Sequence, residues 1–303
     1  MKTKPIRKFL AFLMTAVMLL TVISCGNSAK TDLGKDREGN SVKLPDKIEK
    51  IVSMGPSVTE ILVALGAGDK IIAADINSKG IAGLKSDVVL FNTFELDSEK
   101  LIDLAPDLIF VPSLSKASGT YKLVEDIGIC VVYLPSSTSI EAIKEDIRYI
   151  AAVMGAESKG KTIISDFEKE LAAVKKIGDT ITEKKTVHFE CAAAPWLYVA
   201  GSETFVHEMI VLIGAVNPYA GQKDWFNITD EAVLTANPDV ILTSVDYIPD
   251  PVAEIKSRPG WDAVTAVKNN AVYYIDTDSS NRPNHNIIKA LKEMAKAVYP
   301  DKY

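Results

Sequence analysis

The sequence predicts an α/β protein of two Rossmann-like lobes, joined by one long rigid α-helix, with a ligand cleft between the lobes. Three observations support this fold class. Short apolar runs alternate with helical patterns over residues 50–154, one uninterrupted helical pattern covers Glu157 to Ile177, and the alternation restarts at Val187. Continuous apolar strands separated by helices indicate mostly parallel sheets that are covered on both faces.

The first lobe is expected to contain four strands and four helices. Ser57 stands three residues before Glu60 and Gly66 follows the apolar pattern, so we expect a helix with Ser57 as its N-cap and Gly66 at its end. The expected strands are 50–54, 70–74, 106–111 and 129–133, and the expected helices are 56–65, 98–104, 121–127 and 139–154.

The connection between the lobes is predicted to be a single helix. Its apolar stripe comprises Ile163, Ile164, Phe167, Leu171, Ala172 and Val174, and Lys and Glu fill the other face. About twenty residues at 1.5 Å each extend roughly 30 Å. A rigid connection of this kind permits only small rotations of the lobes.

The second lobe repeats the α/β alternation after the connecting helix. The expected strands are 187–191, 240–243 and 271–275, and the expected helices are 203–213 and 286–298. The sequence thus predicts a signal peptide (1–24), a tether (25–30), an N-terminal lobe (31–154), a linking helix (155–180) and a C-terminal lobe (181–303).

The N-terminus has the pattern of a secretory signal. A basic head precedes an apolar run from Phe9 to Val22, and Val22-Ile23-Ser24-Cys25 resembles the bacterial lipobox. We therefore expect cleavage before Cys25, a lipid on its thiol, and an extracytoplasmic protein anchored to the bacterial membrane. An ordinary signal peptide with an incidental Cys, or an uncleaved N-terminal helix, remains the alternative.

Composition excludes some classes of partner. Four of the 34 basic residues lie in the signal, so residues 25–303 carry 30 basic and 40 acidic side chains, a formal net charge of −10. Nucleic-acid binding needs a concentrated basic face, so we expect none. Cys130 and Cys191 each lie in an apolar run, which favours buried free thiols over a disulfide.

One sequence motif occurs in both lobes. Residues 96–110 and 228–242 each place a capped, acidic helix start before a Pro-Asp pair and a strand. As local structure, Asp97 or Ser98 and Thr229 or Asp230 would cap the helices, while Glu99 and Glu231 would favour the helix dipole. As a recognition site, Glu99 and Glu231 would place one carboxylate on each lobe, an arrangement suited to a partner protein with two-fold symmetry.

Several separated motifs, in order, resemble one protein family. They are residues 51–71, Pro106-Asp107, Tyr198–Gly201, Ile213–Asn217, Asn237–Asp239 and Trp261–Tyr273. The chain resembles the substrate-binding proteins of ABC importers for iron chelates, heme and vitamin B12. The resemblance implies a monomeric, non-enzymatic lipoprotein without a cofactor of its own, which captures a ferric siderophore, heme or cobalamin. It also implies delivery to an ABC permease dimer with its ATPase subunits, with Glu99 and Glu231 contacting permease Arg residues.

The ligand is expected at the carboxyl ends of the strands that face the cleft. The candidates are Met54, Pro56, Ser57, Asn77, Asn92 and Phe94 in the first lobe, and Trp196, Tyr198, Trp225, Asp278, Arg282 and His285 in the second. Trp225 precedes Glu231 by six residues, as a ring-stacking Trp does in a vitamin B12 binder of the family. The other reading makes Trp225 a packing aromatic, and Arg282 a salt-bridge partner of Asp278.

The residues leave the ligand's identity open. Ser279-Ser280 stand where the vitamin B12 binder carries bulky aromatics, and the Arg-rich cleft expected for tri-anionic siderophores is missing. Heme would need an axial ligand such as Tyr198, Met54 or His285. Three dispersed His residues give little support to a bare metal ion.

The alternative class is a surface-anchored enzyme or adhesin on the same scaffold. The sequence contains neither Gly-x-Ser-x-Gly nor His-Glu-x-x-His nor a phosphate-loop pattern, so an enzyme finds little support in it.

Overall fold

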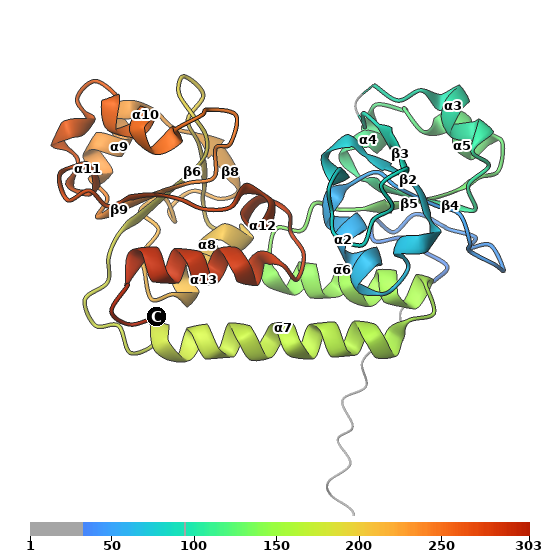
Figure 1. Ribbon diagram of the computed structural model, residues 1–303, viewed down its shortest axis with the longest axis horizontal. Helices are drawn as coiled ribbons and strands as arrows, with labels where there is room; N and C mark the ends of the chain where they lie inside the picture. The colour runs from blue at the N-terminus through green and yellow to red at the C-terminus, as the bar shows by residue number, and fades with distance from the viewer. Residues whose placement is uncertain (1–32, 94) are drawn as a thin grey trace, which may run out of the picture. The chain divides into compact units, whose positions relative to one another are not determined.

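The computed structural model describes residues 33–93 and 95–303 (Figure 1). The predicted signal peptide and tether, Cys25 and Phe94 lie outside the described residues. In the described part, two five-stranded sheets are flanked by helices, as the sequence predicted.

The N-terminal lobe contains a fully parallel sheet with the strand order β3-β2-β1-β4-β5. All five carboxyl ends therefore lie along one edge. The strands are β1 (Ile51–Ser53), β2 (Ile71–Asp75), β3 (Val89–Phe91), β4 (Leu108–Pro112) and β5 (Cys130–Leu134). Sequence analysis missed β3, whose three residues Val-Leu-Phe are too few to display a period.

Alternate residues of these strands pack on opposite faces of the sheet. Ile51 and Phe110 belong to the core under α2 and α6, whereas Val52 and Ile109 pack with Leu101 of α3 and its neighbours. The helices of this lobe are α2 (Pro56–Ala64), α3 (Ser98–Asp103), α4 (Leu114–Ala117), α5 (Lys122–Asp126) and α6 (Ile140–Val153).

The predicted N-cap of α2 is wrong. Gly55 occupies the N-cap position, Pro56 begins the helix, and no side chain caps it. Proline has no N–H and a fixed φ, so it is suited to the first helical position and moves the start ahead of Ser57. Glu60 is consequently free of the reciprocal capping role that the Ser57–Glu60 spacing predicted.

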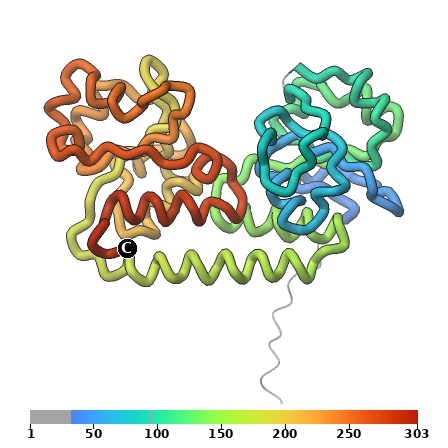
Figure 2. The backbone as a smooth tube through the Cα atoms, viewed as in Figure 1, coloured from blue at the N-terminus to red at the C-terminus, as the bar shows by residue number. Residues whose placement is uncertain are grey.

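Helix α7 (Glu157–Gly178) is the long helix that the sequence predicted between the lobes. Figure 2 shows the chain passing along it from the green to the yellow part of the backbone. Its Ile164, Phe167, Leu171 and Val174 join a core that continues from the N-terminal into the C-terminal lobe. α7 lies within the predicted segment 155–180; the domain boundaries themselves stay a prediction.

The sheet of the C-terminal lobe is mixed, with the order β10-β9-β6-β7-β8. β10, β9 and β6 are parallel, whereas β7 and β8 join antiparallel at one edge. The strands are β6 (Val187–Ala192), β7 (Tyr198–Ala200), β8 (Trp225–Asn227), β9 (Val240–Thr243) and β10 (Val272–Tyr274). Sequence analysis did not identify β7 and β8 as strands.

The C-terminal lobe also has helices on both faces of its sheet. α8 and α13 pack on the face that continues the long core, and α9 and α10 pack with Trp261 on the other face. The helices are α8 (Phe205–Leu212), α9 (Asp230–Ala236), α10 (Pro251–Ser257), α11 (Thr265–Lys268), α12 (Thr277–Asn281) and α13 (Ile287–Val298). Within residues 33–93 and 95–303, no helix combines the length and apolar character needed to cross a bilayer.

Candidate functional site

Two exposed apolar side chains lie at the carboxyl edge of the N-terminal sheet. Ile76 follows β2 and is 52 % exposed, and Leu114 follows β4 and is 75 % exposed. β2 and β4 are the two neighbours of β1, so these side chains flank the Gly55 turn. Exposed apolar groups at strand ends are typical of ligand surfaces in α/β proteins. Neither was predicted from the sequence, because a single apolar residue in a loop belongs to no periodic pattern.

The C-terminal sheet presents two exposed aromatic side chains at its own carboxyl edge. Trp196, a predicted site residue, follows β6 and is 74 % exposed, and Tyr247 follows β9 and is 65 % exposed. Because β6 and β9 are adjacent, their loops lie together, and Ala193 N–H donates to the Tyr247 hydroxyl over 2.8 Å. Sequence analysis missed Tyr247, although an aromatic four residues after a predicted strand was a usable signal.

The other predicted site residues of the N-terminal lobe differ in how exposed they are. Asn77 and Asn92 are exposed at the ends of β2 and β3, and Pro56 and Ser57 are half-buried where α2 begins. Met54 is buried in the core with 1 % exposure. The side chain of Met54 therefore offers no surface here, and we do not include it in the ligand surface proposed below.

Trp225 and Tyr198 form a stacked aromatic pair on adjacent edge strands. Their rings are 6.3 Å apart with an interplanar angle of 8°, and Phe205 meets the Trp225 ring edge-on at 6.1 Å. Trp225 is half-buried and packs against the main core. The contact of Trp225 with a ligand stays a prediction, since much of its ring already faces protein.

Asp278, Arg282 and His285 line a hollow of about 490 Å³ whose walls come from both lobes. Arg282 donates to Asp278 Oδ1 at 2.5 Å and to the carbonyl oxygen of Asn77 at 2.9 Å. The Asp278 side chain is 61 % exposed; its partial desolvation raises its pKa, and the nearby Arg282 opposes that shift. The loop after β2 and the segment between α12 and α13 therefore meet at this hollow.

His285 has an unusual environment in the same hollow. Burial lowers the pKa of its imidazole, partly offset by the negative charge of Glu60, and Lys289 adds to the lowering. Its Nδ1 is buried without a hydrogen-bond partner among the described residues. The neutral imidazole is thus the favoured form in the folded chain.

Glu99 and Glu231 occupy matching positions in the two lobes. Each is exposed in the first turn of a short helix, α3 or α9, and the N-cap residue of each helix stands two positions before the Glu. The capping contacts are Asp97 Oδ1 with Lys100 N–H, and Thr229 Oγ1 with Ala232 N–H. A helix N-terminus also favours a carboxylate, and hydrogen bonds lower the pKa of Glu231.

The Pro-Asp pairs give a structural reason for the motif that is shared by residues 96–110 and 228–242. The Asp107 carboxylate accepts N–H bonds from Glu49 and Lys50, just before β1. The Asp239 carboxylate accepts the N–H of Thr186, just before β6. Each lobe therefore ties the entry of its central strand to the segment that follows its acidic helix.

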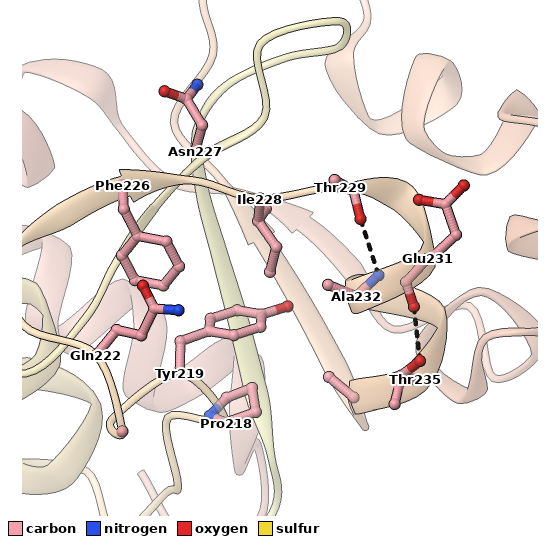
Figure 3. A pocket seen from close by; sticks show the side chains of 12 residues that line it. Pro218, Tyr219, Gln222, Phe226, Asn227, Ile228, Thr229, Glu231, Ala232 and Thr235 are labelled. Carbon is pink, nitrogen blue, oxygen red and sulfur yellow. Dashed lines mark hydrogen bonds between the residues drawn. The ribbon is translucent and has the colours of Figure 1, made fainter.

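Glu231 lies beside a largely apolar hollow of about 690 Å³ (Figure 3). Tyr219, Phe226 and Ile228 project into it, whereas the Glu231 carboxylate points away from the two rings. The hollow itself was not predicted from the sequence. An exposed carboxylate beside apolar surface is a combination suited to protein contacts.

Of the remaining described His and Cys residues, one is buried and three are half-buried. His188 is fully buried with its Nδ1 2.7 Å from the Tyr219 hydroxyl, and His207 Nδ1 is 3.3 Å from Asn217 Nδ2. Cys130 and Cys191 are free thiols, as predicted, but half-buried rather than buried; partial burial raises the pKa of Cys130 to about 11 and that of Cys191 to about 12. In the described part of the chain, no group of three or more His, Cys, Asp or Glu side chains is placed to hold a metal ion.

Two α/β lobes connected by one long helix, with exposed apolar and aromatic side chains at the sheets' carboxyl edges, define a two-lobed binding protein. Residues 51–279 match the periplasmic binding protein family, and the chain belongs to that family. The resemblance inferred from the separated sequence motifs is thereby confirmed.

Three similar proteins illustrate this membership. YvrC of Bacillus subtilis, an uncharacterized ABC transporter substrate-binding lipoprotein, is 33 % identical over 97 % of this chain and 96 % of its own length. A vitamin B12-binding protein of Vibrio parahaemolyticus is 27 % identical, covering 82 % of this chain and 89 % of its own. The crystal structure of a possible iron-binding (periplasmic solute-binding) protein from Staphylococcus epidermidis matches with a TM-score of 0.75 and 28 % identity, over 84 % of this chain and 100 % of its own.

Proposed function

We propose that this chain is the substrate-binding lipoprotein of an ABC importer, which captures a ferric siderophore, heme or cobalamin and delivers it to a membrane permease. Its family and its likeness to YvrC support the transport role. Binding and release without chemical conversion fit that role, so we propose no enzymatic activity.

The observation that carries the ligand class is the exposed aromatic pair Trp196 and Tyr247. Large aromatic faces left in water at the carboxyl edge of a sheet are suited to stacking on a broad planar ligand. Ile76 and Leu114 add apolar surface at the corresponding edge of the other lobe. A corrin or porphyrin ring, or the apolar parts of a ferric chelate, could be held between such surfaces.

Asn77, Asn92 and Tyr198 are proposed to supply polar contacts to the ligand, and Trp225 a further ring. Pro56 and Ser57 would bring the first turn of α2 close to it. Asp278, Arg282 and His285 would close the side where the lobes meet. Ser279 and Ser280, which replace the bulky aromatics, have a structural role: both side chains are buried and donate to Asp276, the N-cap residue of α12.

Membrane attachment and permease docking complete the proposal. A lipid on Cys25 would hold the folded body at the extracytoplasmic face, as a monomer. Glu99 and Glu231 would pair with Arg residues on the two subunits of the permease, because matched charges fix orientation and speed association.

The test is to purify the protein from its own host and record its absorbance spectrum. Heme, corrinoids and ferric chelates are coloured, so a bound ligand of the proposed class gives a visible band and raises the melting temperature. A colourless protein whose melting temperature is unchanged by hemin, cyanocobalamin and ferric desferrioxamine would exclude this ligand class. Turnover of any of the three would favour an enzyme instead.

A further inference from the structure

Glu60 of α2 binds three side chains that come from the other lobe. Its Oε1 accepts Arg282 Nη1 at 2.8 Å, and its Oε2 accepts Asn284 Nδ2 at 2.8 Å and Asn286 Nδ2 at 2.6 Å. Only 10 % of the Glu60 side chain is exposed. A carboxylate has about four acceptor sites, so three of them are used across the lobe boundary.

The donors belong to one short segment between α12 and α13, residues 282–286, which we call the clasp segment. Asn284 is fully buried, and its Oδ1 accepts the N–H of Asn286 at 2.7 Å. Arg282 reaches the N-terminal lobe a second time through the carbonyl oxygen of Asn77. The segment is thus shaped by its own bonds and presents several donors in fixed positions.

The location of these contacts matters for the geometry of the two lobes. α7 connects the lobes on one side. The clasp segment adds a contact where α2 leaves β1, next to the loop after β2. Glu208 of α8 adds another, accepting Ile140 N–H at 2.7 Å. Several separated points of contact restrict the orientation of the lobes further than the connecting helix and its core do alone.

The same contacts lie next to the proposed ligand surfaces. Asn77, whose carbonyl binds Arg282, directly follows Ile76, which is exposed at the carboxyl edge of the N-terminal sheet. α12 precedes the clasp segment, and Thr277 at its start donates to the Ser244 carbonyl, three residues before Tyr247. A change in the clasp would therefore alter the spacing between the Ile76 and Tyr247 edges.

We propose that Glu60 and the clasp segment fix the orientation of the two lobes, and that Glu60 is thereby a positioning residue that selects the thickness of the ligand. If the distance between the two lobes is fixed, a planar macrocycle of matching thickness binds better than a bulkier chelate. A ligand that fits the space poorly makes fewer van der Waals contacts with the lobes. The part concerning the ligand rests on the proposed function; the part concerning lobe orientation does not.

A distance measurement between the lobes tests the proposal. Spin labels are placed at the exposed positions Ser86 and Lys268 by Ser86→Cys and Lys268→Cys, in the full chain with its three native Cys replaced by Ala. We expect Glu60→Ala and Arg282→Gln to broaden the interlobe distance distribution. Glu60→Gln, which keeps the shape but not the charge, serves as a second variant should Glu60→Ala fail to fold.

A matched control removes a carboxylate from an ion pair elsewhere. Glu170 of α7 pairs with Lys292 of α13 on the surface, so Glu170→Ala should leave the distance distribution unchanged. A merely stabilising role for Glu60 would lower the melting temperature in the variants but leave the distances of the folded protein as in the wild type. That result in the folded Glu60 and Arg282 variants overturns the proposal.

Probe binding tests the consequence for the ligand. Hemin, cyanocobalamin and ferric desferrioxamine differ in thickness, and we expect loss of the clasp to change their relative affinities by about 5- to 150-fold, the range of coupling between sites. Equal weakening of all three would contradict a role in selection. If the wild type binds none of them, the proposed ligand class is wrong, while the distances still decide the role of the clasp.

Discussion

Arg258 and Glu190 form a two-point ion pair inside the C-terminal lobe. Arg258 Nη1 and Nη2 lie 2.7 and 2.9 Å from the two carboxylate oxygens of Glu190, which is fully buried. Burial by itself would raise the pKa of Glu190, but the hydrogen bonds and charge of Arg258, with His188 Nε2 3.6 Å away, lower it. The guanidinium also lies 4.5 Å from the centre of the Trp261 ring, and Trp261 donates to Asp230 beside Glu231.

We predict that Arg258→Met lowers the free energy of unfolding by about 3–5 kcal/mol, because it leaves the Glu190 charge buried without its partner. The double variant Glu190→Leu/Arg258→Met removes both charges and should recover most of that loss. Urea unfolding followed by circular dichroism measures both. A single variant as stable as the wild type would show that the pair contributes little.

The two tryptophans of the proposed ligand surface should separate binding from stability. Trp196 is exposed, so Trp196→Ala should weaken binding of the coloured ligand by about 1–3 kcal/mol with little change in stability. Trp225→Ala removes the stack on Tyr198 and should also destabilise the fold. Calorimetric titration and thermal melting of each variant distinguish the two effects. Wild-type affinity in folded Trp225→Ala would remove Trp225 from the site.

The sequence predicts the repeating parts of this fold and misses the parts that depend on distant partners. The apolar stripe of Ile164 to Val174 keeps the helical period over about three turns, so α7 could be identified at once. β8 has three residues, two of them half-buried and one exposed, which gives no alternation to detect. Arg282 was expected to bind a ligand, but its partner Glu60 lies 222 residues away, and no local pattern reports a contact of that kind.

The same limit explains the error at α2. Ser57 and Glu60 have the spacing of a capping box, yet Pro56 starts the helix earlier and Glu60 binds the other lobe. Trp196 was identified because an aromatic in a loop after a strand is a local signal. Tyr247 carried a similar signal, and only its hydrogen bond to the Ala193 N–H shows that the two loops form one surface.

We predict that stability falls in mild acid because of His285. Its pKa in the folded chain is lowered by burial, while Glu60 and Lys289 are the charged groups that act on it. Well above pH 6.5, the approximate pKa of His in the unfolded chain, the imidazole is neutral in both states. As the pH falls below that value, the unfolded chain takes up the proton first, so unfolding becomes more favourable by at most about 1.4 kcal/mol per pH unit.

The comparison with His285→Gln isolates this contribution. The variant cannot titrate at position 285, so its free energy of unfolding should fall less steeply than that of the wild type between pH 6.5 and the folded pKa. Denaturant unfolding at a series of pH values measures the difference. Parallel curves for the two proteins would contradict the assignment to His285.

Lipidation is predicted to depend on Cys25. The variant Cys25→Ala removes the thiol that would carry the lipid, so the protein should move from the detergent phase to the aqueous phase in a partitioning experiment. Ser24→Ala keeps the thiol and serves as the control. Equal membrane association of Cys25→Ala and the wild type would favour an uncleaved N-terminal helix.

Docking to the permease provides the last prediction. Glu99 and Glu231 are exposed at equivalent helix starts, and the Asp of the Pro-Asp pair that follows each binds the backbone just before the central strand of its lobe. Glu99→Lys/Glu231→Lys should leave ligand affinity and melting temperature nearly unchanged, because neither side chain is buried. It should abolish ligand uptake and the stimulation of ATP hydrolysis by the permease, because like charges would then face the permease Arg residues.

Glu38→Lys/Glu183→Lys changes the net charge equally at exposed positions elsewhere and should preserve uptake. If the Glu99/Glu231 double variant drives uptake as well as this control does, the two carboxylates serve only the dipoles of their own helices.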